Sequence, residues 1–243
     1  MPRLYLLDIE GTVSPISFVY DVLFPYARAR LPEFLTHNWN HPEIQSELQL
    51  LAKENQRELA SGAAPPEIPQ HTGPALRDNT IQSSIAYLFW LMDRDRKSTA
   101  LKSLQGKVWA EGYERGELLS MVFADVAPAL ERWHKQSKIA IYSSGSVEAQ
   151  KNFFAHTNSG DLSPFLNGYF DTRTGPKTEM QSYLTIAAAF AVSPAEVLFI
   201  SDSLAELDAA RQAAIKTALS IRPGNPEADE TQDHRAIRSF DEL

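Results

Sequence analysis

Two carboxylates separated by one residue, Asp8 and Glu10, directly follow the apolar run 4–7. An aspartate in this position could attack a phosphate ester as a nucleophile and so divide hydrolysis into two easier steps. The neighbouring glutamate could protonate the leaving group and later activate water. The alternative is an acidic turn after a strand, because aspartate and glycine are favoured in turns. The pentapeptide 8–12 by itself leaves both interpretations open.

Three further segments carry residues that could bind a phosphate group or a metal ion. Ser143 and Ser144 precede a predicted helix, whose positive N-terminal end could hold phosphate oxygens. Lys177 lies in a loop before another helix and could neutralise phosphate and nucleophile as a compact charge. Asp202 and Asp8 could supply the carboxylate oxygens that Mg²⁺ prefers. The alternatives are helix N-caps for the serines and Asp202, and a solvated side chain for Lys177.

Glu206 lies four residues after Asp202, one turn along a predicted helix. It could order the metal site by contacting the residues around the ion and not the ion itself. The alternative is an exposed acidic side chain in solvent. A Mg²⁺ ion held by Asp8 and Asp202 would reduce the repulsion between these carboxylates and phosphate. It would also stabilise the charge that develops in the transition state.

The elements that carry these residues predict a parallel α/β sheet. Short apolar runs alternate with helical segments, which is typical of parallel strands covered by helices on both faces. The runs are 4–7, 139–142, 197–200 and 217–221. Polar residues follow three of the runs at the carboxyl end of the strand, where open parallel sheets bind ligands. We therefore expect residues that are distant in the sequence to meet at one edge of the sheet.

A long helical segment separates the first predicted strand from the others. Apolar residues recur at helical spacing over 44–51 and again over 81–92. We predict an α/β core made of residues 1–14 and 125–243, with an all-helical domain, residues 15–124, inserted after the first strand. That position suits a lid that closes over the strand ends.

The composition narrows the class of protein. The chain has 243 residues, 43% of them hydrophobic, no cysteine, and a net charge of −8. The lack of cysteine excludes disulfides, zinc–thiolate sites and thiol nucleophiles. An acidic chain without an aromatic and basic stripe is a poor nucleic-acid binder, and no run approaches the roughly 20 apolar residues of a membrane helix. We expect a cytoplasmic enzyme for a small molecule, with no nucleic-acid or membrane partner.

The order of these motifs resembles the haloacid dehalogenase-like superfamily of phosphotransferases, whose fold is a Rossmann-like sheet with an inserted cap. Glu10 stands where that superfamily usually has a second aspartate. With this change, the run 7–12 resembles the enolase-phosphatases of methionine salvage, also called acireductone synthases. Other segments share the likeness and span nearly the whole chain: 15–26, 95–109, 141–150, 170–172, 198–202 and 222–225.

The resemblance implies roles for the metal-binding residues. Asp8 would be the nucleophile and a ligand of one Mg²⁺ ion. Glu10 would give its main-chain carbonyl to the metal and its side chain to proton transfer. Asp202 would complete the metal site.

The resemblance also implies how the phosphate is held. Ser143 and Ser144 would bind it and Lys177 would position it. The family acts, as a monomer, on a 2,3-diketo-5-methylthiopentyl-1-phosphate, which it first enolises and then dephosphorylates. Glu10 or a residue of the helical insertion could take the C1 proton, and both stay open.

The insertion contains residues at which substrate contacts could be sought, Lys97, Gln105 and Trp109. It is an equally good interpretation that Trp109 packs between helices and that Lys97 is exposed to solvent, with neither contacting the substrate. For the whole chain, the alternatives are a general sugar-phosphate phosphatase, a binding module that has lost catalysis, and a dehalogenase. Dehalogenases of this kind need no magnesium, so the presence of Asp202 argues against the last.

Overall fold

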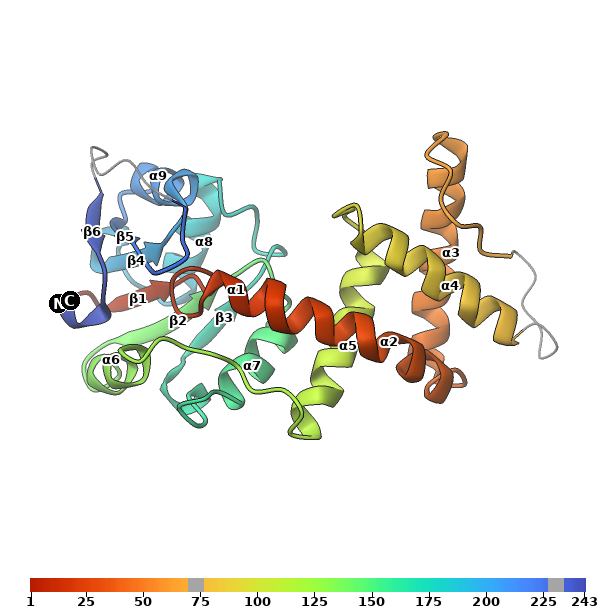
Figure 1. Ribbon diagram of the computed structural model, residues 1–243. Helices are drawn as coiled ribbons and strands as arrows, with labels where there is room; N and C mark the ends of the chain where they lie inside the picture. The colour runs from red at the N-terminus through yellow and green to blue at the C-terminus, as the bar shows by residue number, and fades with distance from the viewer. Residues whose placement is uncertain (70–76, 227–233) are drawn as a thin grey trace. The chain divides into compact units, whose positions relative to one another are not determined.

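The computed structural model describes residues 1–69, 77–226 and 234–243 of the chain. The chain divides into two compact units (Figure 1). An α/β unit contains Met1–Asp21 and Arg115–Leu243, and a helical unit contains Val22–Glu114.

The boundaries between the units differ from the predicted ones at 14/15 and 124/125. Residues on both flanks are held by the α/β unit. Phe18 packs edge-on against Phe153, with ring centroids 6.1 Å apart, and the main-chain N–H of Phe123 donates to the carbonyl of Val13 at 3.0 Å. These contacts depend on tertiary structure, so periodicity alone does not reveal them.

In the described part of the chain, six parallel strands form one sheet in the order β3-β2-β1-β4-β5-β6 (Figure 1). The strands are β1 Leu4–Leu7, β2 Lys138–Tyr142, β3 Gly168–Phe170, β4 Val197–Ser201, β5 Lys216–Ser220 and β6 Arg235–Ile237. The four predicted strands are present as β1, β2, β4 and β5. The two edge strands, β3 and β6, are three residues long, which is too short to give a recognisable apolar run.

Helices cover both faces of the sheet, which confirms the predicted α/β fold class. In Figure 1, α6 and α7 lie on one face, and α8 and α9 lie on the other. These helices are α6 Val126–Trp133, α7 Val147–Ala155, α8 Met180–Ala189 and α9 Leu204–Gln212. A short α1, Ile16–Phe18, leads into a π-helical turn, Val19–Leu23, and single 3-10 turns occur at Ser163–Phe165, Pro194–Glu196 and Phe240–Glu242.

Strand β1 is buried on both of its faces. Leu4 and Leu6 belong to the core cluster under α8 and α9. On the opposite face Tyr5 stacks on Trp133, with ring centroids 4.0 Å apart and planes 6° from parallel. Full burial of such side chains contributes about 1.5–3 kcal/mol each. The strand is thereby fixed in the centre of the sheet, and with it the position of Asp8 at its end.

The helical unit contains α2 Phe24–His37, α3 Pro42–Ala60, α4 Arg77–Met92 and α5 Thr99–Glu114. Every regular element in its described residues, 22–69 and 77–114, is a helix. Its core is formed by buried aliphatic side chains such as Leu31, Leu51, Leu88 and Leu104. The helical periodicity of the sequence comes from this internal core.

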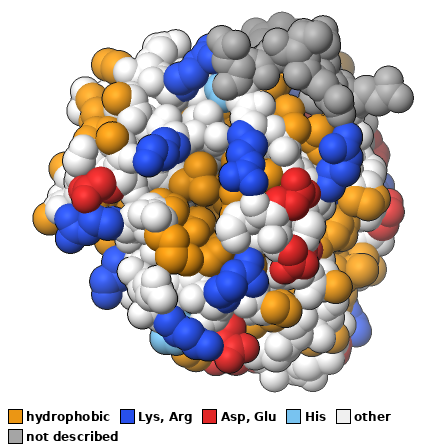
Figure 2. All heavy atoms as spheres, turned by 90° about the vertical axis from the view of Figure 1, so that its left-hand side faces the viewer, with side chains coloured by type: hydrophobic (Ala, Val, Ile, Leu, Met, Phe, Trp, Pro, Cys, Tyr) orange, Lys and Arg blue, Asp and Glu red, His pale blue; other side chains and the backbone are white. Residues whose placement is uncertain are grey.

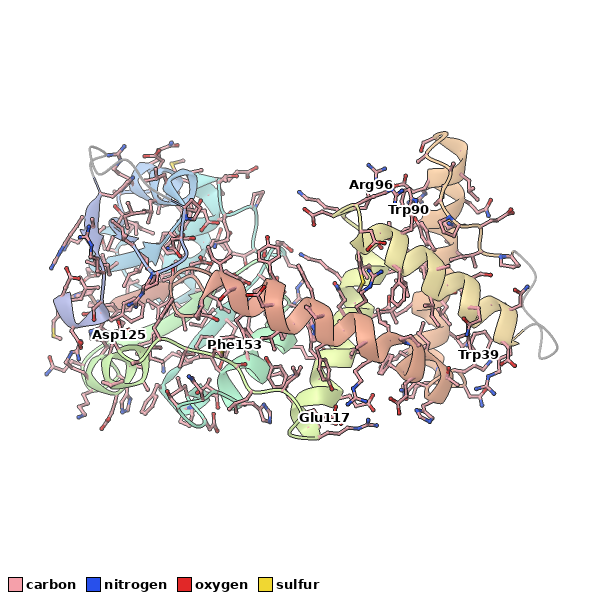
Figure 3. The ribbon with its side chains drawn as sticks, in the orientation of Figure 1. Trp39, Trp90, Arg96, Glu117, Asp125 and Phe153 are labelled. Carbon is pink, nitrogen blue, oxygen red and sulfur yellow. The ribbon has the colours of Figure 1, made fainter. Side chains whose placement is uncertain are left out.

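Asp125, which precedes α6 (Figure 3), is held by hydrogen bonds from other parts of the α/β unit. Its carboxylate accepts hydrogen bonds from Arg222 at 2.8 and 3.0 Å and from the main-chain N–H of Phe240 at 2.6 Å. Burial raises the pKa of Asp125, but these hydrogen bonds outweigh burial and leave the pKa below its usual range. Arg222 also donates to the carbonyl of Thr12 at 3.2 Å, so the pair steadies the loop after β1.

Figure 2 shows the face of the α/β unit that carries β6. Lysine and arginine side chains are interspersed there with acidic and apolar ones. Among the described residues, no helix is both long and apolar enough to cross a membrane.

Candidate active site

The strand register brings three predicted site residues to one edge of the sheet. Leu7 pairs with Ile141 of β2 and with Ile200 of β4, so the residues that follow these strands are neighbours. The main-chain N–H of Asp8 donates to the carbonyl of Ile200 at 3.0 Å, which extends the β1–β4 pairing by one residue. Ser143 follows β2 and Asp202 follows β4. The sequence expectation that these residues meet at the carboxyl edge is confirmed.

Lys177 lies between two carboxylates at this edge. Its ammonium group is 2.5 Å from Asp8 Oδ1 and 2.6 Å from Glu206 Oε2. The side chains are 11%, 5% and 17% exposed, respectively, so the ion pairs are largely shielded from water. The interpretation of Lys177 as a solvated surface residue is therefore wrong, and so is that of Glu206 as an exposed acid.

The loop that carries Lys177 is held by buried tyrosines. Tyr183 Oη donates to the carbonyl of Lys177 at 2.7 Å, and Tyr142 Oη donates to the carbonyl of Gly175 at 2.9 Å. Gly175 has φ +138°, and a side chain there would collide with Ser182. Glycine is thus required where this loop turns toward the strand ends.

The ammonium group of Lys177 stays charged in this setting. Burial lowers its pKa, but the neighbouring carboxylates of Asp8 and Glu206 outweigh burial and raise the pKa above its usual value. Burial and the charge of Asp8 raise the pKa of Glu206, although Lys177 and a hydrogen bond from Ser201 Oγ oppose this. A lysine held in this way supplies a fixed positive charge for an anionic ligand.

Glu10 is the second carboxylate of the first motif. Its pKa is raised, first by burial and then by the charge of Asp8. Ser143 Oγ lies 3.4 Å from Glu10 Oε2, which joins the loops after β1 and β2. A carboxyl group with a raised pKa keeps its proton to higher pH, as a general acid must.

Asp202 lies against the turn at Gly11. Gly11 has φ +71°, and a side chain at that position would collide with the Asp202 carboxylate. Burial, together with the charges of Asp8 and Glu206, raises the pKa of Asp202 to about 7. The close approach of the Gly11 backbone and the Asp202 side chain thus requires glycine at residue 11.

The predicted metal site combines side-chain carboxylates with a main-chain carbonyl. In residues 1–69, 77–226 and 234–243, no three His, Asp or Glu side chains are placed to hold a metal together. Asp8 and Asp202 offer carboxylates, and the main chain of Glu10 offers a carbonyl, which with water suits Mg²⁺. After burial, the charges of Asp8 and Glu206 are the causes that raise the pKa of Asp202, and a divalent cation would relieve this repulsion. The residues present therefore fit the expected ion.

The loop after β2 carries Ser143 and Ser144 and leads directly into α7. Ser143 is buried and its Oγ accepts a hydrogen bond from the main-chain N–H of Gly145 at 3.3 Å, while Ser144 is exposed. The N-cap of α7 is Ser146, whose Oγ accepts from the N–H of Ala149 at 3.2 Å. Because Ser146 is the N-cap of α7, the N-cap alternative for Ser143 and Ser144 is wrong.

Two residues near this edge were not recognised as site residues from the sequence. Asn225 Nδ2 donates to the carbonyls of Gly11 and Ser220, at 2.9 and 3.1 Å. Ser220 Oγ donates to the same Gly11 carbonyl at 3.1 Å. Ser220 ends β5, so the rule that polar residues gather at carboxyl ends of parallel strands could have indicated it.

In the helical unit, Trp109 has a structural role. Its indole Nε1 donates to the carbonyl of Leu23 at 2.8 Å, and its ring stacks on Phe24 with centroids 6.3 Å apart. Gln105 is buried, whereas Lys97 is exposed, as is its neighbour in the sequence, Arg96, which Figure 3 labels. Helix packing is therefore the better interpretation for Trp109.

Known proteins resemble the chain along nearly all of its length. The family model for haloacid dehalogenase-like hydrolases matches residues 2–214. An enolase-phosphatase E1 of Synechococcus elongatus is 52% identical over 98% of this chain and 96% of its own. A probable bifunctional methylthioribulose-1-phosphate dehydratase/enolase-phosphatase E1 of Sorghum bicolor is 43% identical, over 98% of this chain and 46% of its own. The solved structure of UTR4 protein from Saccharomyces cerevisiae is 34% identical, with a TM-score of 0.79 and full coverage of both chains.

Proposed function

Because the chain belongs to the haloacid dehalogenase-like hydrolases and, within them, to the enolase-phosphatases, we propose that it converts 2,3-diketo-5-methylthiopentyl-1-phosphate to the acireductone 1,2-dihydroxy-3-keto-5-methylthiopentene and phosphate. The observation that carries this proposal is the buried Asp8–Lys177–Glu206 group at the strand ends. A nucleophile held beside a fixed cation suits attack on an anionic phosphate ester.

The relative from Sorghum bicolor supports the choice of substrate. Its name joins an enolase-phosphatase to a methylthioribulose-1-phosphate dehydratase in one chain. Loss of water from a methylthioribulose phosphate leaves a diketone that still carries the phosphate ester. Such a product has an acidic proton at C1, next to a carbonyl, and so can be enolised before the phosphate is removed.

In the proposed phosphatase step, an oxygen of Asp8 attacks phosphorus and the bond from phosphorus to the substrate oxygen breaks. Glu10 gives its proton to that oxygen as it leaves. The aspartyl phosphate on Asp8 is then hydrolysed by a water molecule whose proton Glu10 takes, which releases phosphate and restores Asp8. Asp8 and Glu10 thus serve in both halves of the reaction.

The phosphate is held, in this proposal, by Ser143 and Ser144 in the turn before α7 and by Lys177. The main-chain N–H groups of that turn lie at the positive end of the helix. Lys177, charged at all relevant pH because its pKa is raised, balances the charge of phosphate and nucleophile. The three groups orient the phosphorus toward Asp8.

The ligands of one Mg²⁺ ion would be the carboxylates of Asp8 and Asp202 and the main-chain carbonyl of Glu10. The ion would supply positive charge that stabilises an enolate and the transferring phosphate. The helical unit is proposed as a lid that excludes water. A residue of that lid or Glu10 could accept the C1 proton. The enzyme is proposed to act in the cytoplasm as a monomer. Sedimentation of the purified chain would test its oligomeric state.

Phosphate release from the diketo-methylthiopentyl phosphate, with and without Mg²⁺, tests the proposal, while absorbance follows the enol. A transient enol followed by metal-dependent phosphate release is the expected result. If the chain releases phosphate from simple sugar phosphates but not from this substrate, it is a general sugar-phosphate phosphatase. A chain that releases phosphate from no ester would be a binding module on the same fold.

A further inference from the structure

Asn225 lies in the loop after β5, and its amide group ties that loop to the turn after the nucleophile. Nδ2 donates to the Gly11 carbonyl at 2.9 Å and to the Ser220 carbonyl at 3.1 Å. The Gly11 carbonyl accepts a second hydrogen bond, from Ser220 Oγ at 3.1 Å. Two donors on one carbonyl fix the peptide between Gly11 and Thr12, one peptide beyond the Glu10 carbonyl.

The other atom of the amide group, Oδ1, is buried and accepts no hydrogen bond from the described residues. A buried acceptor without a donor is costly, on the order of 1–3 kcal/mol, and calls for an explanation. Oδ1 lies close to the backbone of Gly11. A Cβ built there would lie 3.0 Å from Asn225 Oδ1 and would collide with Asp202 Oδ2.

Asn225 Oδ1 and the Asp202 carboxylate therefore both lie close to Gly11, on the side where a side chain would project. Asp202 is one of the two carboxylates proposed to hold Mg²⁺, and the Glu10 carbonyl precedes the peptide that Asn225 fixes. Mg²⁺ usually keeps several of its waters when it binds to a protein. A water of hydration has protons to donate, and an acceptor in this position could receive one.

We propose that Asn225 is a positioning residue for the cation site. Its Nδ2 fixes the backbone that presents the Glu10 carbonyl, and its Oδ1 accepts a hydrogen bond from the hydration shell of the cation. The inference rests on the proposed function for the identity of the cation, and it adds a residue from a fourth strand end to the site.

Mg²⁺ binding to the metal-free full-length chain, measured by titration calorimetry without substrate, tests the inference. Asn225→Ala is expected to raise the Kd for Mg²⁺ about tenfold or more, as is typical when an outer partner of a metal site is removed. Ser220→Ala removes one of the two donors to Gly11 and leaves Oδ1 in place, so a smaller rise is expected. If the alanine variant does not fold, Asn225→Ser replaces it, because serine is too short to reach both carbonyls.

A matched control is Asn167→Ala. Asn167 Oδ1 accepts from the main-chain N–H of Ile139 at 3.0 Å, near the amino end of β2 and thus at the opposite edge of the sheet. Both Asn variants should lower the urea midpoint of the metal-free protein, but only Asn225→Ala should weaken Mg²⁺ binding.

A Kd within twofold of wild type in the Asn225 variants would overturn the inference and leave a purely structural role. Phosphate release by the wild-type chain, measured separately, would then still support the proposed function. A wild-type chain that releases phosphate but binds no Mg²⁺ would overturn the inference and the choice of metal together.

Discussion

The α/β unit and the helical unit use charge in opposite ways. In the α/β unit, Lys177 lies between the shielded carboxylates of Asp8 and Glu206. In the helical unit, pairs such as Arg28–Asp93 and Lys107–Glu43 have partners with side chains that are 55% and 69% exposed. Exposed pairs contribute about 0–1 kcal/mol, whereas buried charges are costly to desolvate. Stabilisation of the fold therefore gives little reason for burying Lys177 between Asp8 and Glu206. The proposed reaction with a phosphate ester does give a reason.

Asp8→Asn is expected to have the largest effect on activity. Without a nucleophilic carboxylate, phosphate release should fall on the order of 10⁴-fold or more, as for nucleophile removal in other hydrolases. The measurement is the turnover number with the diketo phosphate. Asp93→Asn removes an exposed carboxylate of the helical unit and should keep turnover within about twofold of wild type. Near-normal turnover of Asp8→Asn would exclude Asp8 as the nucleophile.

Glu10→Gln should lower kcat about 10²- to 10⁴-fold, because the leaving group loses its proton donor. The pH profile gives a second readout. The pKa of Glu10 is raised, so the wild-type rate should hold to a higher pH than an ordinary glutamate allows and then decline as the acid ionises. The glutamine variant should lack this decline. A rate unchanged over the whole profile would refute the assignment of Glu10 as the acid.

Lys177→Met removes the cation that Asp8 and Glu206 share. Loss of one fixed charge at the reacting phosphate should cost about 10²- to 10³-fold in kcat. Lys107→Met is the matched control, since that lysine pairs with the exposed Glu43. If both variants lost activity equally, the buried setting of Lys177 would have no special role.

Asp125→Asn breaks a shielded ion pair outside the proposed chemistry. Arg222 and Asp125 side chains are 4% and 13% exposed, and loss of one partner should cost about 3 kcal/mol of unfolding free energy. Urea denaturation at neutral pH measures it, and Asp93→Asn should cost only about 0–1 kcal/mol.

The sign of the pH dependence follows from the lowered pKa of Asp125. Its contribution to stability is complete above the unfolded-state pKa of an aspartate and is lost as pH falls through the lower folded-state pKa. The difference between wild type and Asp125→Asn should therefore shrink only in acid. A difference that stays constant down to the lowest pH at which the chain folds would contradict the ion-pair explanation.

Much of the sheet and of the site could be predicted from the sequence because both depend on local pattern. Apolar runs such as 139–142 and 197–200 are buried strands whose hydrophobic residues are contiguous. The rule that ligands bind at the carboxyl ends of parallel strands then placed Asp8, Ser143 and Asp202 together. The short edge strands carry no such pattern, and their pairing depends on strands already in place.

The α/β class, the order of the chemical residues and the family could thus be predicted before the fold was known. The pairing of Lys177 with Asp8, 169 residues away, and with Glu206 is visible only in the folded chain. The same holds for the hydrogen bond from Asn225 to the Gly11 carbonyl. The physical reason is that an ion pair or a hydrogen bond requires an approach of about 3 Å, and loops from different strand ends reach that distance only when the sheet is assembled.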